Sequence, residues 1–222
     1  MGLGCLNPGK CNCGPRVLLW DLDREYPTLT SLAACQAVYD SLGIQADLAS
    51  NSEYTGDIDD YDFILASWIA YDPSWLADLA TWSGRLLLAG DYERVPPASP
   101  IGNPVSNAWI NAFCVAKGID ISIDGNDYVR SVFNRVATTD ISTAMAAIGG
   151  DLNSSITVGA SATELYESVA FFPTPPPAPV PVTARHRIGN IDYVIHGDGT
   201  TFVTAGNVAS WADWLEELAT VP

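Results

Sequence analysis

Three aspartates, Asp21, Asp23 and Asp91, follow apolar runs that have the length of a β-strand. Asp21 and Asp23 end the segment RVLLWDLD, and Asp91 follows RLLLAG. Carboxylates at the carboxyl ends of parallel strands can hold Mg²⁺, which prefers oxygen ligands. One interpretation is therefore a metal-dependent hydrolase that uses these three side chains. The alternative is that Asp21 and Asp23 cap a loop or face solvent.

The chain has five cysteines, and they fall into two groups. Cys5, Cys11 and Cys13 form a C-x5-C-x-C pattern in a segment rich in Gly, Asn and Pro. Their thiolates could bind Zn²⁺, with a fourth ligand supplied from elsewhere. The alternatives are a local disulfide, or free thiols in an arm that docks on a neighbouring subunit. Cys35 and Cys114 lie on the apolar faces of predicted helices, where a free cysteine usually packs as a small hydrophobe.

Continuous apolar runs predict the strands that would position these side chains. The runs cover residues 16–21, 44–49, 62–68 and 85–89. A strand without polar alternation is typical of a parallel sheet that is covered on both faces. Helices are expected between the strands, at 28–42 and 72–83. The sequence thus predicts an α/β fold with a mostly parallel, doubly wound sheet of the flavodoxin-like kind.

The predicted helix at 72–83 has a marked beginning and end. Asp72 is a favourable N-cap and is followed by Pro73, whose missing N–H costs nothing at the first helical position. Gly84 would supply the left-handed stop. The apolar residues between them recur at helical spacing: Trp75, Leu79 and Trp82.

The second half of the chain predicts more helices and a hairpin. Helices are expected at 107–117 and 207–218, the latter with Ser210 and Asp213 as a capping box. Four apolar residues also have helical spacing: Val129, Val132, Phe133 and Val136. A hairpin is expected at 184–197, turning at Gly189-Asn190, and a strand at 201–204.

These elements divide the chain into an arm and one domain. Residues 1–15 have no apolar periodicity and predict an irregular Cys- and Gly-rich arm. Residues 16–222 predict a single α/β domain that ends in the hairpin and the last helix. Residues 173–182, PTPPPAPVPV, predict a stiff proline-rich loop within it.

The charge balance excludes some classes of partner. The formal net charge is −16, from 26 acidic and 10 basic residues. Nucleic-acid binding needs clustered lysine and arginine, so we expect no nucleic-acid partner. An anionic membrane surface is disfavoured for the same reason. No apolar run approaches the roughly 18 residues of a membrane span, and no secretory signal is recognisable, so synthesis and folding in the cytoplasm are expected.

The order of these segments resembles a known family. RVLLWD, ADLAS, YDFILASW and RLLLAGD, followed later by NAWINAFCVAKGI and HGDGTTFVTAGNVASWADWLEEL, are similar to class I glutamine amidotransferase-like domains. The closer resemblance is to the non-catalytic relatives of that family. It covers most of residues 16–220 and is one of pattern. It implies an amidotransferase-like α/β fold.

The sequence departs from the family where the chemistry would be. Catalytic members carry a nucleophilic Cys on a sharp turn after a strand, and the corresponding turn here, LLLAGDYE, holds no cysteine. His196 is followed by Gly-Asp-Gly rather than by a Pro and Glu arrangement. Without a thiolate and its base, nucleophilic acyl transfer has no reactive group. The resemblance therefore implies that glutaminase activity is lost.

A phosphatase pattern is also incomplete. Haloacid dehalogenase-type phosphatases use a similar D-x-D after the first strand, but Glu25 stands where that family has Thr or Val. No lysine lies between Ser67 and Asp91.

The leading hypothesis is a non-enzymatic structural or interaction module without a required cofactor. It could be one component of a large assembly, such as a virus or phage particle, that associates through its N-terminal arm. The alternatives are a metal-dependent, phosphatase-like hydrolase that uses the three aspartates, and a small-molecule binding module at the ends of the strands.

Overall fold

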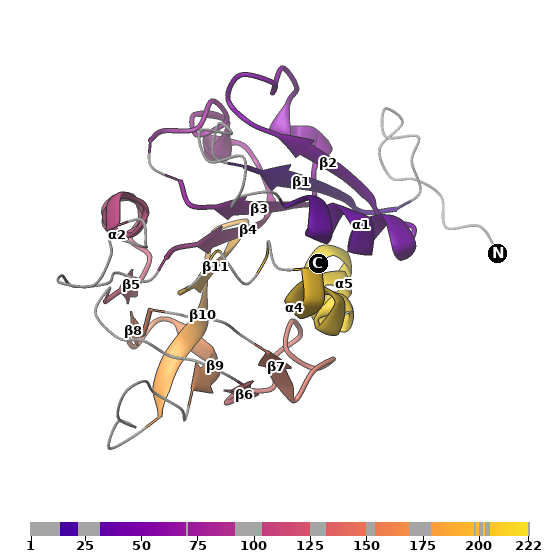
Figure 1. The fold of residues 1–222 in the computed structure, drawn as a ribbon. Helices are drawn as coiled ribbons and strands as arrows, with labels where there is room; N and C mark the ends of the chain where they lie inside the picture. Colours follow the sequence, from indigo (N-terminus) through magenta and orange to yellow (C-terminus); the bar gives the residue numbers. More distant parts are fainter. Residues whose placement is uncertain are drawn as a thin grey trace, which may run out of the picture.

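A nine-stranded mixed sheet forms the centre of the molecule in the computed structural model (Figure 1). The structure describes residues 14–21, 32–69, 71–91, 104–124, 132–149, 154–168, 179–197, 199, 202 and 205–221. The strand order in the sheet is β2-β1-β3-β4-β11-β10-β9-β6-β7, and β5 and β8 form a second, two-stranded sheet.

Five adjacent strands of the large sheet are parallel to one another. They are β2 (Gln45–Ala49), β1 (Arg16–Trp20), β3 (Phe63–Ser67), β4 (Gly84–Ala89) and β11 (Ile191–His196). Every residue of β3 and β11 is buried. This burial explains why the sequence of β3, FILAS, is a nearly continuous apolar run. The predicted α/β fold with a parallel core is confirmed.

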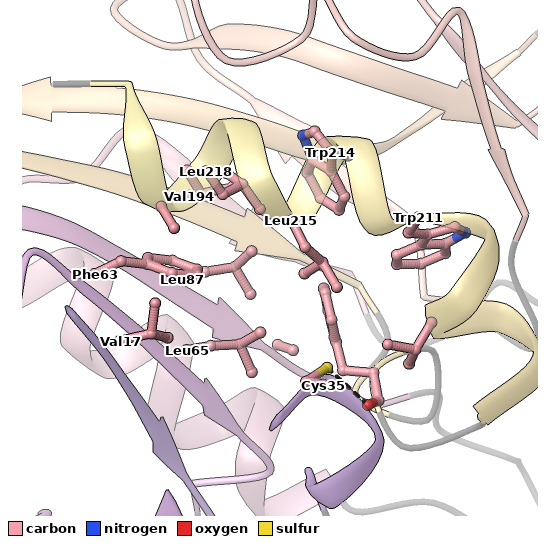
Figure 2. Close-up of a cluster of buried hydrophobic side chains, with 14 of the residues drawn as sticks. Val17, Cys35, Phe63, Leu65, Leu87, Val194, Trp211, Trp214, Leu215 and Leu218 are labelled. Atoms are coloured by element: carbon pink, nitrogen blue, oxygen red, sulfur yellow. Dashed lines mark hydrogen bonds between the residues drawn. The ribbon is translucent and has the colours of Figure 1, made fainter. Parts of the chain in front are cut away.

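Side chains of these strands alternate between two cores, one on each face. On one face they pack against α1 (Ala33–Ser41), α4 (Ala205–Ser210) and α5 (Ala212–Thr220). Figure 2 shows Leu215 of α5 on the side of the helix that faces Phe63 and Leu65 of β3. On the other face the strands pack against α2 (Pro104–Lys117), residues 75–82 and the sheet of β5 (Ile121–Ile123) and β8 (Ile156–Val158). Two covered faces make the sheet doubly wound.

The other half of the sheet is antiparallel. It consists of β10 (Val180–Ile188), β9 (Thr163–Ser168), β6 (Val132–Arg135) and β7 (Ala147–Gly149). The predicted hairpin is confirmed as β10 and β11, with Gly189 at φ +59° in its turn. Val180 to Val182, the end of the expected proline-rich loop, begin β10. Pro181 lies at a register irregularity against β9, where a missing N–H is tolerated.

The helix expected at 72–83 is not formed. The segment makes turns and one short 3-10 helix, η2 (Asp78–Ala80), and Gly84 begins β4 instead of ending a helix. Trp75, Leu79 and Trp82 are buried as predicted. Their burial against the sheet, rather than a helical backbone, accounts for the spacing.

Three further expectations are corrected. Residues 132–135 are β6 rather than a helix, because they pair with β7 and β9 at the edge of the sheet. Phe202, the described residue of the strand expected at 201–204, is helical. The final helix is interrupted at Trp211, which takes the cap position of α5 in place of Ser210. No helix among the described residues is long and apolar enough to cross a membrane.

Candidate functional site at the carboxyl edge of the sheet

The carboxyl ends of the parallel strands meet at one edge of the sheet. Asp21 follows β1, Trp68 follows β3, Gly90 and Asp91 follow β4, and Gly197 follows β11. Ligands of open α/β sheets bind at such an edge. It is therefore the candidate site, and two of the predicted aspartates lie there.

Asp21 holds the beginning of α1. Its carboxylate oxygens accept the Leu32 N–H at 3.2 and 3.3 Å, and its own N–H donates to the Ala49 carbonyl at 3.0 Å. The residue is 5% exposed. This arrangement matches the loop-capping alternative. Asp23 lies outside the described residues.

Asp91 is held by the side chain of Asn107 from α2. Asn107 Oδ1 accepts the Asp91 N–H at 2.9 Å, and Asn107 Nδ2 donates to the Asp91 carbonyl. Ser154 Oγ donates to the same carbonyl at 2.7 Å. All three residues are buried. The backbone of Asp91 is thus fully hydrogen-bonded within the protein.

The backbone of Gly90 is also hydrogen-bonded at both its N–H and its carbonyl. Its N–H donates to the His196 carbonyl at 2.9 Å, and its carbonyl accepts the Gly199 N–H at 2.6 Å. A Cβ at position 90 would collide with Asn107 Oδ1 and Ile123 Cδ1, so a larger residue would have to displace these two side chains. By the resemblance seen in the sequence, this turn corresponds to the one that carries the nucleophile in catalytic amidotransferases. Here both of its described N–H groups are used by internal hydrogen bonds.

Ser67, which belongs to the phosphatase pattern, and Trp68, which the sequence did not identify, also lie at this edge. Trp68 has φ +54°, the left-handed region that a bulky residue rarely adopts. Within the part of the chain that the structure describes, Ser67 Oγ and Trp68 Nε1 have no hydrogen-bond partner, although both residues are at most 5% exposed. Both atoms lie against Gly199, where a Cβ would collide with them. Nothing in the sequence around Trp68 predicts its positive φ, because tryptophan has no preference for the left-handed region.

His196 is enclosed by aromatic rings at the end of β11. Its ring is 0% exposed and lies 5.3 to 6.4 Å, between centroids, from the rings of Phe133, Phe202, Trp211 and Trp214. Nδ1 bonds Thr183 Oγ1 at 2.7 Å. Burial lowers the pKa of His196 to about 3, because the charged imidazolium would lose its hydration. The imidazole is therefore neutral and lies within the core.

The two described cysteines are core residues, as predicted. Cys35 and Cys114 are at most 1% exposed, and Cys35 Sγ donates to the Phe202 carbonyl at 3.0 Å. Burial raises the pKa of Cys114 to about 12 and raises that of Cys35 as well. Neither thiol is a ready nucleophile.

The predicted soft-metal or disulfide cysteines, Cys5, Cys11 and Cys13, lie outside the described residues. Among the residues that the structure does describe, no group of three or more His, Cys, Asp or Glu side chains is arranged to hold a metal ion.

Comparison with known proteins identifies the fold. No protein-family model matches the chain, and no curated protein matches its sequence. The N-terminal domain of mmIFT52 is similar in structure, with a TM-score of 0.65, 13% identity, and coverage of 92% of this chain and 97% of that one. A putative GMP synthase protein from Thermoplasma acidophilum has a TM-score of 0.53 and 10% identity, with 94% and 96% covered.

A third similar structure belongs to a longer chain. The β-galactosidase from Bacillus circulans sp. alkalophilus matches with a TM-score of 0.54 and 16% identity. The match covers 94% of this chain but 32% of the β-galactosidase. At these identities the likeness shows the fold alone. The chain has the fold of class I glutamine amidotransferase-like domains.

Proposed function

We propose that this protein is a non-catalytic interaction module built on an amidotransferase-like fold. The observation that carries the proposal is the state of the turn after β4. The N–H groups of Gly90 and Asp91 donate to the His196 carbonyl and to Asn107 Oδ1. Acyl transfer needs N–H groups free to stabilise an oxyanion, and neither of these is free.

The chemistry of the nearby side chains supports the same proposal. The described thiols are buried, and burial raises their pKa values, so neither offers a thiolate. The His196 ring is buried among aromatic rings, and burial lowers its pKa to about 3, so it would be a weak base. The metal-dependent hydrolase is less well supported, because the Asp21 carboxylate already accepts the Leu32 N–H.

The finer form of the proposal concerns assembly. We propose synthesis in the cytoplasm, association with protein rather than nucleic acid or membrane, and a place in a large assembly such as a virus or phage particle. The support comes from the sequence: the acidic charge, the Cys-rich arm and the proline-rich segment.

The absence of catalysis is tested with two substrates. The full chain is incubated with glutamine, and separately with p-nitrophenyl phosphate and Mg²⁺, and glutamate or nitrophenol is measured. We expect no turnover above that of the Asp21→Asn and Asp91→Asn variants. Turnover by the natural chain that either substitution abolishes would establish the hydrolase instead. Glutamine hydrolysis lost in Cys35→Ser or Cys114→Ser would establish an amidotransferase.

The assembly proposal is tested by mass in solution. Light scattering compares the full chain with a chain that lacks residues 1–15. A large oligomer that dissociates when the arm is removed supports assembly through the arm. Equal masses for the two chains would contradict it.

A further inference from the structure

The outward face of α2 is apolar. Val115 is 83% exposed and Val105 is 55% exposed. The remaining exposed residues of the helix before Lys117 are alanines: Ala108, Ala112 and Ala116. At 100° per residue these five side chains fall within one arc of about 100°. Figure 1 shows α2 at the periphery of the molecule, beside β5. We name this set of five residues the α2 face.

The α2 face is unusual for this chain. The exposed residues of α5 are polar, namely Asp213, Glu216 and Thr220. By contrast α2 contains no carboxylate, and Lys117 is its single charged residue. The whole chain has 26 acidic residues. A carboxylate-free, apolar helix face on such a protein marks a surface for contact with protein.

Trp109 borders the α2 face and is held in place. Its ring stacks on Phe113, with centroids 5.3 Å apart and an interplanar angle of 14°. Its Nε1 donates to Asp72 Oδ1 at 2.9 Å. The half-buried ring is therefore fixed before any partner arrives, which lowers the entropic cost of binding.

We propose that the α2 face binds the same face of a second copy of this chain. The two helices run antiparallel about a two-fold axis that passes beside Ala112. This inference rests on the proposed function as an interaction module and assigns to it a contact surface in addition to the N-terminal arm.

Helical geometry makes the α2 face complementary to itself in this arrangement. An antiparallel two-fold pairing centred on Ala112 brings the same flank of each helix together, so residue 115 of one copy lies level with residues 108 and 109 of the other. Val115 then faces Ala108 of the second copy on one flank. Ala116 faces Trp109 on the other flank. Each large side chain thus meets a small one, which allows the close packing of a helix pair.

The local charge of the α2 face is compatible with a second copy as the occupant. Two chains of net charge −16 repel one another wherever their carboxylates approach. The α2 face lacks carboxylates, so two copies can meet there without an opposed pair of negative charges.

The size of the contact sets its strength. One helix face against another buries less than the roughly 800 Å² per partner of a standard stable interface. We therefore expect a reversible dimer that forms as concentration rises, and that weakens at low salt because the net charges then repel over a longer distance.

Sedimentation velocity of the full chain over about two decades of concentration tests the proposal. We expect the average mass to double between low and high concentration, in addition to any association through residues 1–15. Ala112→Glu places two carboxylates beside the two-fold axis and should abolish the dimer. Ala37→Glu adds the same charge at an exposed position of α1 and should leave the dimer unchanged. Circular dichroism confirms that both variants are folded.

A cross-link tests the register. In a chain with Ser at positions 5, 11 and 13, Ala112→Cys should form a disulfide-linked dimer on oxidation, and Ala37→Cys should not. A natural chain that stays monomeric throughout, or a dimer that tolerates Ala112→Glu, would overturn self-pairing through α2. Turnover of glutamine would instead overturn the proposed function, whatever the mass, so the two failures are distinguishable.

Discussion

The carboxamide of Asn107 makes two hydrogen bonds to the backbone of Asp91, one to its N–H and one to its carbonyl. This pair ties α2 to the turn after β4 across 16 positions of the sequence. The turn that would carry chemistry in an amidotransferase is thereby made into a packing contact. The outer side of the same helix is the α2 face. Helix α2 therefore contributes both to the hydrogen-bonded turn after β4 and to the proposed interface.

The Asn107→Ala variant should lose both hydrogen bonds. Because the donors and acceptors left behind are buried, we expect the free energy of unfolding to fall by about 2–4 kcal/mol. Asn111→Ala is the matched control, since Asn111 makes the same two bonds to the backbone of Ile123 in a half-buried position. Urea denaturation measures both. An equal loss of unfolding free energy in the two variants would show that the bonds to Asp91 stabilise the protein no more than those to Ile123.

The sequence predicted the parallel half of the fold well. Continuous apolar runs are specific to strands buried on both faces, so β1, β3 and β4 were recognisable. Gly189, expected in the turn of the hairpin, has positive φ. These features depend on local sequence, which is why they could be identified.

The remaining elements depend on distant contacts. Three residues have helical spacing, namely Trp75, Leu79 and Trp82. They lie in turns and a short 3-10 helix, and their side chains are buried against the sheet. Residues 132–135 are a strand because β7 and β9 supply their hydrogen bonds. The spacing of apolar residues within one segment does not show which distant strands that segment will pair with.

The candidate site was only partly predictable for the same reason. Asp21 and Asp91 were placed correctly at the carboxyl edge, because residues after parallel strands share that edge. The side chains that hold the backbone of Asp91, Asn107 and Ser154, come from remote segments and carry no motif. The left-handed backbone conformation of Trp68 could not be predicted from the sequence either.

Ser67 and Gly199 should show energetic coupling. Ser67→Ala removes a buried hydroxyl that has no partner among the described residues, so we expect stability to be unchanged or to rise by up to about 1 kcal/mol. Gly199→Ala should destabilise, because its Cβ would collide with Ser67 Oγ. In the Ser67→Ala background that cost should be smaller. Thermal denaturation of the natural chain, the two single variants and the double variant completes a double-mutant cycle. If the two changes in stability simply add, the contact between Ser67 and residue 199 is contradicted.

His196 should make the protein sensitive to acid. The unfolded imidazole has a pKa near 6.5, and burial lowers the folded value to about 3. Between these values the unfolded state binds more protons, so the stability supplied by the neutral imidazole is complete above about pH 6.5 and is lost as the pH falls toward 3. The loss approaches about 1.4 kcal/mol per pH unit.

The His196→Gln variant isolates this effect from the titration of carboxylates. The stability difference between the natural chain and this variant should shrink as the pH falls from 6.5. His186→Asn is the control, since His186 lies on β10 and its Nδ1 accepts the Asp120 N–H at an exposed site. A stability difference for His196→Gln that does not change with pH would contradict the buried neutral imidazole.

Asp192 should be more important to stability than a surface carboxylate. It accepts hydrogen bonds from Arg85 Nε at 2.7 Å and Arg185 Nε at 2.6 Å, and it is 3% exposed. Asp192→Asn removes the carboxylate that pairs with the buried Arg85, and it leaves Arg185 with Asp140 alone. We expect a loss of about 3–5 kcal/mol. Asp60→Asn, which weakens an exposed pair with Arg16, should cost less than about 1 kcal/mol. Similar losses measured by urea denaturation would contradict the prediction.

The described thiols should be inert in the folded protein. In a chain with Ser in place of Cys5, Cys11 and Cys13, we expect no reaction with a disulfide reagent at pH 8. Cys35 and Cys114 are buried, and burial raises the pKa of each thiol. Two thiols should react in urea, and one in a chain that also carries Cys35→Ser. Rapid labelling of a single thiol in the folded chain would reveal an accessible thiolate, and with it the group that acyl transfer requires.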